Sequence, residues 1–173
     1  MNRIVERSLE HPFFAELLQQ PPVPVARSIA PNREHFADYF AQMCETRRFS
    51  NFGPLHEKLR ERLRTHLDAE LLGLFANATL ALTIALRAHE VSGEVITTPF
   101  SFAASAQAIE WAGAAPVYVD VDPVALTIDP SCVERAITSR TTAILAVHIY
   151  GIPCDVDALA TIARRHNLAL IFD

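Results

Sequence analysis

Short apolar runs alternate with longer helical runs from residue 71 to the end of the sequence, and this alternation constrains the fold most. The apolar runs are rich in β-branched residues and are predicted strands: residues 71–75, 94–97, 117–119, 143–147 and 169–172. The runs between them are predicted helices: residues 79–89, 102–112, 130–136 and 156–166. Strands that are apolar on both sides and alternate with helices are typical of a parallel sheet. The sequence therefore predicts an α/β fold, with a mainly parallel sheet and helices on both faces.

The stretch GEVITTPFSF, residues 93–102, brings aromatic residues to the end of a predicted strand. Pro99 cannot donate to a sheet ladder and biases Thr98 away from helix, so the strand ends there. In open parallel sheets, ligands bind where strands lead into helices at their carboxyl ends. Phe100 and Phe102 are therefore either ordinary core residues or a surface on which a flat cofactor stacks.

A candidate phosphate site follows the first predicted strand, in the stretch FANATLALTIALRA. Asn77 stands at the N-cap position of a helix, and the free N–H groups of a first helical turn favour an anion. The small side chain of Ala78 permits close approach to the backbone, and the Thr79 hydroxyl can add a hydrogen bond. Because Asn-capped helices are common, this motif alone does not separate a phosphate site from an ordinary helix start.

Two further polar residues follow predicted strands. Asp173 comes after apolar Ile171 and Phe172, where a carboxylate is costly unless it is paired, and a protonated ring nitrogen could supply that pairing. His148 is either a hydrogen-bonded structural residue or a substrate contact. A phosphate-binding helix start, a stacking aromatic and a carboxylate are together the groups needed to hold pyridoxal 5′-phosphate, whose protonated ring is an electron sink.

Composition argues against several other classes of protein. The net charge of −5 without a basic run argues against a nucleic-acid surface. No apolar stretch approaches the roughly 20 residues that span a bilayer, and the N-terminus is charged where a signal peptide is apolar. Three cysteines without a CxxC pair indicate free thiols, so a cytoplasmic location is expected. The seven histidines lack the i, i+4 spacing of a metal site, so no metal is expected.

The chain is expected to consist of an arm and part of one domain. Residues 1–32 include a Pro-rich segment and are predicted to form the arm, and residues 33–173 are predicted to be the N-terminal portion of a larger domain. Helices are expected at residues 34–45 and 55–67. The last predicted strand reaches Asp173, so nothing after it would cover the sheet. We therefore expect a piece of a longer protein, and the alternative is a terminal edge strand.

The order of several motifs makes the sequence recognisable: SNFGP, NATLAL, GEVITTPFSFAAS, GAAPVYVDVDP, ITSRTTAILAVHIYG and LIFD. From about residue 23 to residue 173 it resembles the sugar-nucleotide aminotransferases of the DegT/StrS family, which are fold-type I pyridoxal-phosphate enzymes. The resemblance implies a set of cofactor-binding residues: Asn77, Ala78, Thr79, Phe102 and Asp173. It also assigns two residues to the substrate side: Asn51 and His148.

The resemblance further implies roles and partners. Ala78 and Thr79 would hold the phosphate, Phe102 would stack on the ring, and Asp173 would pair with the pyridine nitrogen. The branch of the family that the sequence resembles most aminates nucleotide-linked 4-keto-6-deoxy sugars, usually with glutamate as donor, for surface polysaccharides or secondary metabolites. Because the family's active sites lie at a dimer interface, a homodimer is implied.

Two departures from the family pattern matter. Asn77 and Ala78 stand where the family usually has Ser and Gly, which changes contacts to the phosphate. The only lysine is Lys58, on a predicted amphipathic helix, so no residue of this chain is assigned as catalytic and the Schiff-base lysine is expected beyond Asp173. A family member that dehydrates its sugar, with histidine in place of that lysine, is one alternative. A non-catalytic protein that binds the cofactor or a partner is the other.

Overall fold

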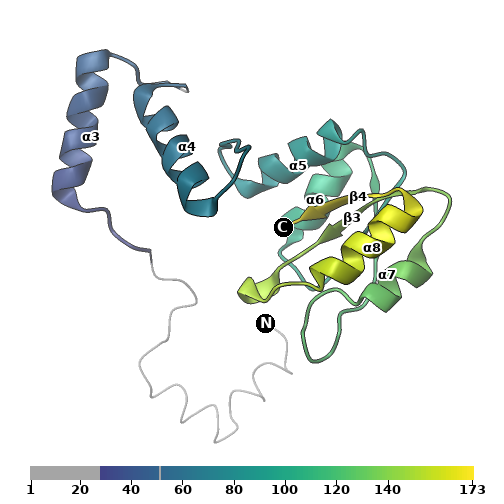
Figure 1. Ribbon diagram of the computed structural model, residues 1–173. Coiled ribbons are helices and arrows are strands. Elements are labelled where there is room, and N and C mark those ends of the chain that lie inside the picture. Colours follow the sequence, from purple (N-terminus) through teal and green to yellow (C-terminus); the bar gives the residue numbers. More distant parts are fainter. Residues whose placement is uncertain (1–27, 51) are drawn as a thin grey trace, which may run out of the picture. The chain divides into compact units, whose positions relative to one another are not determined.

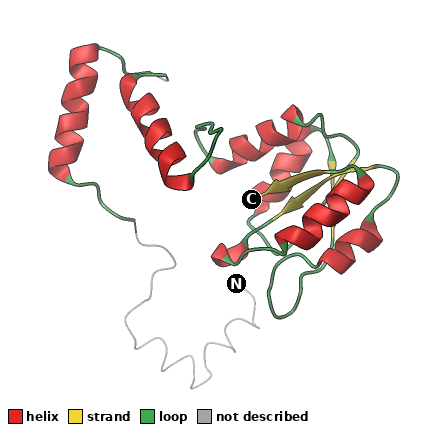
Figure 2. Ribbon diagram, viewed as in Figure 1, coloured by secondary structure: helices red, strands yellow, loops and turns green. Residues whose placement is uncertain are grey.

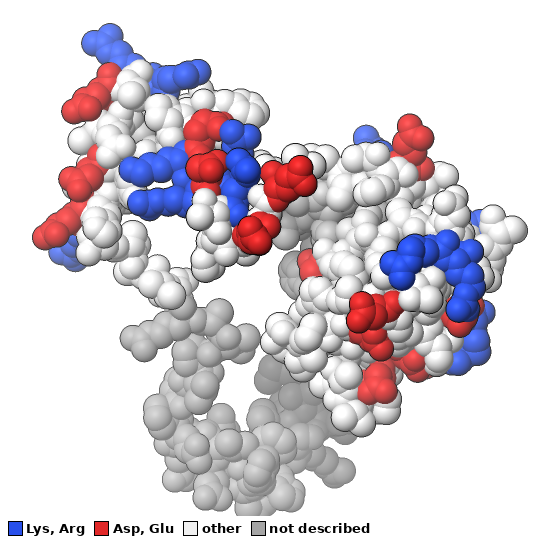
Figure 3. Space-filling model, in the orientation of Figure 1, with Lys and Arg blue, Asp and Glu red and all other residues white. Residues whose placement is uncertain are grey.

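The computed structural model describes residues 28–50 and 52–173. The chain divides into two compact units, Met1–Leu71 and Leu72–Asp173. Most of the expected arm, residues 1–32, lies outside the described residues, so its boundary stays a prediction. Within the described ranges, no helix has the length and apolar character needed to cross a membrane. On the face drawn in Figure 3, basic and acidic side chains are interspersed.

Within its described residues, the first unit contains two helices, α3 (Arg33–Thr46) and α4 (Pro54–Leu67). Tyr39 of α3 contacts α4 through its hydroxyl and its ring. The hydroxyl accepts a hydrogen bond from Arg62 Nη1 at 3.1 Å, and Lys58 Nζ lies 5.0 Å from the ring centroid. Neither helix has a buried residue among those described, so these contacts are made at an open surface.

The second unit is a four-stranded parallel sheet, in the order β2-β1-β3-β4, with helices on both faces (Figures 1 and 2). Its strands are β1 (Glu94–Thr97), β2 (Ala115–Tyr118), β3 (Thr141–Ala146) and β4 (Ala169–Phe172). Its helices are α5 (Ala78–Ala88), α6 (Ala103–Ala112), α7 (Pro130–Ala136), α8 (Val156–His166) and the short 3-10 helix η1 (Ile149–Gly151). The predicted α/β fold with a parallel sheet is confirmed.

The strand order reverses once along the chain. From β1 the chain passes through α6 to β2 on one side, then returns through α7 to β3 on the other side and continues through α8 to β4. The helix α6 covers one face, and α7 and α8 cover the opposite face. All three crossovers therefore have the same hand, as the right-handed rule for parallel strands requires. The reversal falls between β1 and β3, whose carboxyl ends are the expected ligand position in such a sheet.

The two faces of the sheet bury separate apolar clusters. One joins the sheet to α5 and α6: Val95, Leu145, Leu86 and Ile109. The other joins it to α7 and α8: Ile96, Ile144, Val133 and Leu159. Successive strand residues point to opposite faces, so neighbours such as Val95 and Ile96 enter different clusters. This is why the strands read as continuous apolar runs rather than as alternating ones.

The predicted strand at residues 71–75 is wrong. This segment has no regular secondary structure, and the side chains of Leu71 and Phe75 are 88% and 48% exposed. A strand is stabilised by backbone hydrogen bonds to a neighbour, and within the described sheet the segment pairs with neither outer strand, β2 or β4. Apolar composition alone therefore did not make it a strand.

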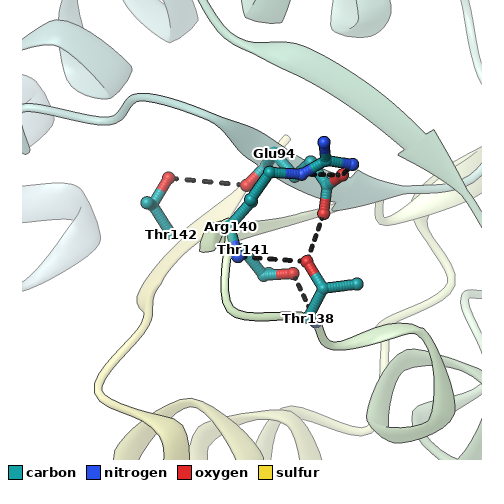
Figure 4. A network of polar contacts seen from close by, with 5 residues as sticks. All are labelled: Glu94, Thr138, Arg140, Thr141 and Thr142. Atoms are coloured by element: carbon teal, nitrogen blue, oxygen red, sulfur yellow. Dashed lines mark hydrogen bonds and ion pairs between the residues drawn. The ribbon is translucent and has the colours of Figure 1, made fainter.

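The amino ends of β1 and β3 are joined by a polar network around Glu94 (Figure 4). The buried Glu94 carboxylate accepts hydrogen bonds from Thr138 Oγ1 at 2.6 Å and from Arg140 Nε at 2.9 Å, and it also pairs with Arg140 Nη2. The Thr138 hydroxyl, followed by the Arg140 guanidinium, lowers the pKa of Glu94 below its usual value. This network lies at the edge of the sheet opposite to the carboxyl ends of the strands.

Candidate active site

The loops that follow β1 and β3 meet where the strand order reverses. The rings of Phe100 and Tyr150 pack edge to face, with centroids 6.2 Å apart. Tyr150 adopts a left-handed backbone with φ 53°, which is unusual for a bulky residue, and its side chain is 80% exposed. Aromatic side chains are thus exposed at the carboxyl ends of the strands, where the strand order reverses.

Phe102 is the N-cap residue of α6. Pro99 ends β1, and the Phe100 N–H donates to Thr98 Oγ1 at 3.1 Å, which shapes the turn between strand and helix. Phe102 keeps an extended backbone, and the residue is 80% exposed. Among the described residues, Phe102 is therefore not part of the core, and its ring is open to a ligand.

Asp173 directly follows β4 and continues its pairing with β3. Its N–H donates to the Ala146 carbonyl at 2.8 Å, and its carbonyl accepts from the His148 N–H at 2.9 Å. Its Oδ2 accepts a hydrogen bond from the Ser105 hydroxyl of α6 at 2.6 Å. Within the described residues β4 is flanked only by β3, so the apolar surroundings expected for Asp173 stay a prediction.

His148 is held from two sides. Its ring stacks on Phe172 with centroids 4.9 Å apart and planes 10° apart. Its Nδ1 accepts a hydrogen bond from the Cys154 N–H at 3.0 Å, so the neutral ring carries its proton on Nε2. The Cys154 thiol donates to the Val147 carbonyl at 3.2 Å, and burial raises the pKa of this thiol. The imidazole is therefore a fixed N–H donor beside the strand that ends at Asp173.

The helix α5 begins on the side of the sheet toward which the strands point (Figure 1). Asn77 caps it, because its Oδ1 accepts from the Leu80 N–H at 2.9 Å and its carbonyl accepts from the Ala81 N–H at 3.2 Å. The cap leaves the first-turn N–H groups of Ala78 and Thr79 for another acceptor. A dianionic phosphate fits these donors and the positive end of the helix dipole.

The structure thus joins some of the predicted site residues and leaves others apart. A backbone hydrogen bond joins His148 to Asp173, and the Ser105 side chain links Asp173 to the helical turn that begins at Phe102. The convergence of Thr79 with these residues on one cavity stays a prediction. Asn51 lies outside the described residues.

Sequence reasoning missed Ser105 and Cys154 as supporting residues. Ser105 could have been found from its position three residues after Phe102, on the first turn of a predicted helix. The role of Cys154 depends on a loop conformation that no local pattern indicates.

The groups that these residues offer suit pyridoxal phosphate. Backbone N–H groups at a helix start suit its phosphate, an exposed aromatic ring suits its pyridine face, and a carboxylate suits its ring nitrogen. No group of three or more His, Cys, Asp or Glu side chains within residues 28–50 and 52–173 is arranged to hold a metal ion.

Comparison with known proteins gives close relatives. The Escherichia coli dTDP-4-amino-4,6-dideoxy-D-glucose transaminase is 41% identical over 151 residues, which cover 87% of this chain and 41% of the relative. The Pseudomonas aeruginosa UDP-2-acetamido-2-deoxy-3-oxo-D-glucuronate aminotransferase is 41% identical over 123 residues, which cover 70% of this chain and 34% of the relative. This chain therefore spans at most about two fifths of the length of these relatives.

Solved structures agree with this result. DesI in the presence of its TDP-sugar product matches with a TM-score of 0.84 at 34% identity, over 88% of this chain and 39% of that chain. NtdA from Bacillus subtilis with bound cofactor PMP matches with a TM-score of 0.74 at 28% identity, over 91% of this chain and 42% of that chain. The fold is that of fold-type I pyridoxal-phosphate-dependent aminotransferases. The family model matches residues 31–173, and the chain therefore belongs to the DegT/DnrJ/EryC1/StrS aminotransferase family.

Proposed function

We propose that this chain is the cofactor-binding part of a pyridoxal-phosphate-dependent aminotransferase that acts on a nucleotide-linked keto sugar. The observation that carries the proposal is the Asp173 carboxylate, which lies at a strand end, bonded to the helical turn that begins at Phe102. Family membership supports the same chemistry. Pyridoxal phosphate, when bound, supplies an electron sink for moving an amino group between an amino acid and a ketone.

Each proposed binding residue has a separate task. The N–H groups of Ala78 and Thr79 bind the phosphate at the start of α5, with the Thr79 hydroxyl as a further donor. The Phe102 ring stacks on the pyridine face. Asp173 accepts a hydrogen bond from the ring nitrogen, and its negative charge favours the protonated form of that nitrogen. His148 and Asn51 remain the proposed substrate contacts.

The lysine that the family uses is proposed to lie outside this chain. Lys58 is the only lysine of the sequence, and it packs over the Tyr39 ring of the first unit. It therefore already has a partner within the helix pair. The Schiff-base lysine is expected after Asp173.

The proposed substrate is a 4-keto-6-deoxy sugar linked to a nucleotide, with glutamate as amino donor. The names of the relatives support a sugar nucleotide in general, and the transaminase relative from Escherichia coli supports amination at carbon 4. A cytoplasmic homodimer that serves surface polysaccharide or secondary-metabolite synthesis completes the proposal.

The test uses the protein translated from the complete reading frame. It is incubated with pyridoxal phosphate, glutamate and dTDP-4-keto-6-deoxyglucose, and the sugar product is identified by mass spectrometry. An amino sugar nucleotide with one 2-oxoglutarate per turnover is the expected result. A keto sugar that has lost a hydroxyl group would instead indicate the dehydratase alternative.

Two variants sharpen this test. Asp173→Asn should weaken pyridoxamine phosphate binding by about tenfold or more, because the ring nitrogen then meets a neutral amide oxygen instead of a charged carboxylate. Lys58→Gln is the control and should leave binding and turnover unchanged. Cofactor binding without any turnover would indicate a non-catalytic cofactor-binding protein, and no cofactor binding at all would indicate a non-catalytic protein that binds a partner.

A further inference from the structure

A single hydrogen bond ties the proposed ring-nitrogen partner to the helix that carries the proposed stacking residue. The Ser105 hydroxyl donates to Asp173 Oδ2 at 2.6 Å, although the two residues are 68 positions apart in the sequence. Ser105 is only 1% exposed, so its hydroxyl lies inside the packed part of the unit. The bond therefore holds the Asp173 carboxylate to a fixed, buried donor.

The direction of the Ser105 side chain is informative. A serine inside a helix commonly bonds back to a carbonyl one turn earlier or points to solvent. Ser105 instead donates out of its helix to the end of β4, and its own N–H donates to the Phe102 carbonyl at 3.1 Å. One helical turn thus fixes both the residue proposed to stack on the cofactor and the donor to the carboxylate.

We propose that Ser105 is a positioning residue, which fixes the rotation of the Asp173 carboxylate so that Oδ1 is the oxygen that accepts from the cofactor's ring nitrogen. This inference rests on the proposed function. A hydroxyl bond to an ionised carboxylate is charge-assisted and is stronger than a neutral one. Ser105 uses one acceptor position of Oδ2, whereas no described residue donates to Oδ1, so Oδ1 keeps both of its acceptor positions for a ligand.

The same bond could serve only to attach α6 to β4. The two roles differ in what they predict for ligands. A positioning role matters only for a ligand that carries the ring nitrogen, whereas a purely structural role affects every ligand of the site equally. Pyridoxamine phosphate and its 1-deaza analogue, in which carbon replaces the ring nitrogen, make this comparison. Neither ligand requires a lysine for binding.

The chain offers a matched control at the opposite edge of the sheet. Thr138 Oγ1 donates to the Glu94 carboxylate at 2.6 Å, the same length as the Ser105 bond. Ser105→Ala and Thr138→Val therefore each remove one hydroxyl-to-carboxylate hydrogen bond, and Thr138→Val also removes the acceptor of the Arg140 N–H. Only Ser105 lies beside the proposed cofactor residues. Ser105→Thr keeps the hydroxyl, and Ser105→Cys replaces it with a weak donor of similar size.

The experiment measures dissociation constants of both ligands by calorimetry, on the complete protein and its variants, together with the melting temperature. Ser105→Ala should weaken pyridoxamine phosphate binding by about tenfold and change binding of the deaza analogue less than about twofold. Ser105→Thr should bind like the unsubstituted protein, and Ser105→Cys should fall between. Thr138→Val should lower the melting temperature without changing either affinity.

Equal losses for the two ligands, or no loss for either, would overturn the positioning role. If Ser105→Ala does not fold, the comparison of Ser105→Cys with Ser105→Thr decides the question in the same way. Failure of the unsubstituted protein to bind pyridoxamine phosphate would overturn the proposed function and the role of Ser105 together. If the unsubstituted protein binds both ligands but the Ser105 variants show no selective effect, the proposed function survives and only the positioning role fails.

Discussion

Two carboxylates at opposite ends of the sheet have different surroundings. Glu94 is buried at the amino end of β1, where Thr138 and Arg140 satisfy both of its oxygens. Asp173 lies at the carboxyl end of β4, where Oδ2 accepts a hydrogen bond from Ser105 and Oδ1 has no donor among the described residues. The first arrangement stabilises the fold, and the second leaves an acceptor for a ligand.

Acid should remove the stabilisation that Glu94 provides. Its pKa in the folded protein is lowered from the usual 4.5, first by the Thr138 hydroxyl and then by Arg140. The folded state therefore binds the proton more weakly than the unfolded state. The contribution of Glu94 is complete above about pH 4.5 and is lost as the pH falls through the folded-state pKa. Urea unfolding between pH 7 and pH 3 should show this decline.

Glu94→Gln is the matched variant for that measurement. This variant should be less stable than the unsubstituted protein at pH 7, because a neutral amide cannot form an ion pair with Arg140. The urea concentration at its unfolding midpoint should fall less steeply as the pH is lowered. Parallel pH profiles for the two proteins would contradict the assignment.

At the scale of elements, the start of α5 combines a cap with a proposed phosphate site. Asn77→Ala should cost about 1 kcal/mol of folding free energy, because the Leu80 N–H loses its acceptor. Asn77→Asp keeps the cap and should retain stability, but its added negative charge should repel a phosphate bound at Ala78 and Thr79.

The two readouts separate the roles of Asn77. Asn77→Asp should bind pyridoxamine phosphate several-fold more weakly and bind pyridoxamine, which lacks the phosphate, unchanged. Calorimetry with both ligands and urea unfolding of each variant provide the check. If Asn77→Asp binds pyridoxamine phosphate as tightly as the unsubstituted protein, the phosphate does not bind at the start of α5.

Two glycines with left-handed backbones end or begin elements, and their replacement should differ in cost. At Gly113, which terminates α6 with φ 95°, an added Cβ meets no atom within 4 Å. Gly113→Ala should therefore cost only the strain of the left-handed conformation, about 1–2 kcal/mol. At Gly93, before β1, an added Cβ would lie 2.5 Å from the Arg140 carbonyl oxygen.

Gly93→Ala should consequently destabilise the fold more than Gly113→Ala, since the backbone at Arg140, just before β3, must move as well. Urea unfolding of the two single variants, run side by side, gives the comparison. Equal destabilisation would mean that the segment around Arg140 adapts without cost.

At the scale of the whole molecule, the chain consists of two compact units with a boundary at Leu71 and Leu72. Glu70 lies in the irregular segment between α4 and α5, and its residue is exposed. Brief digestion with a glutamate-specific protease should therefore cut after Glu70 before it cuts within the second unit. The expected product begins at Leu71 and persists, because the sheet and its helices have their own core.

Mass spectrometry of the digest identifies the first cut. Early cleavage after Glu90 or Glu110, in or beside the helices that cover the sheet, would show that the second unit does not hold together as described.

Local sequence determined the elements whose signals are self-contained. Pro99 ends β1, Gly113 terminates α6, and Asp129 and Asp155 cap α7 and α8, so these boundaries followed from the residues themselves. The two-sided apolar strands gave the parallel sheet for the same reason, because burial on both faces is visible in composition. The position of Phe102 at a strand-to-helix turn also followed from the turn chemistry, but local sequence left open whether its ring is buried or exposed.

Only the tertiary structure decided features that depend on partners distant in sequence. The segment at residues 71–75 has strand composition, but a strand exists through hydrogen bonds to a neighbour, which local sequence does not specify. The Ser105 bond to Asp173 and the Cys154 bond to His148 likewise depend on how elements meet. Strand order, which places β1 beside β3 and creates the ligand-binding edge, is set by packing across the whole sheet rather than by any single stretch of residues.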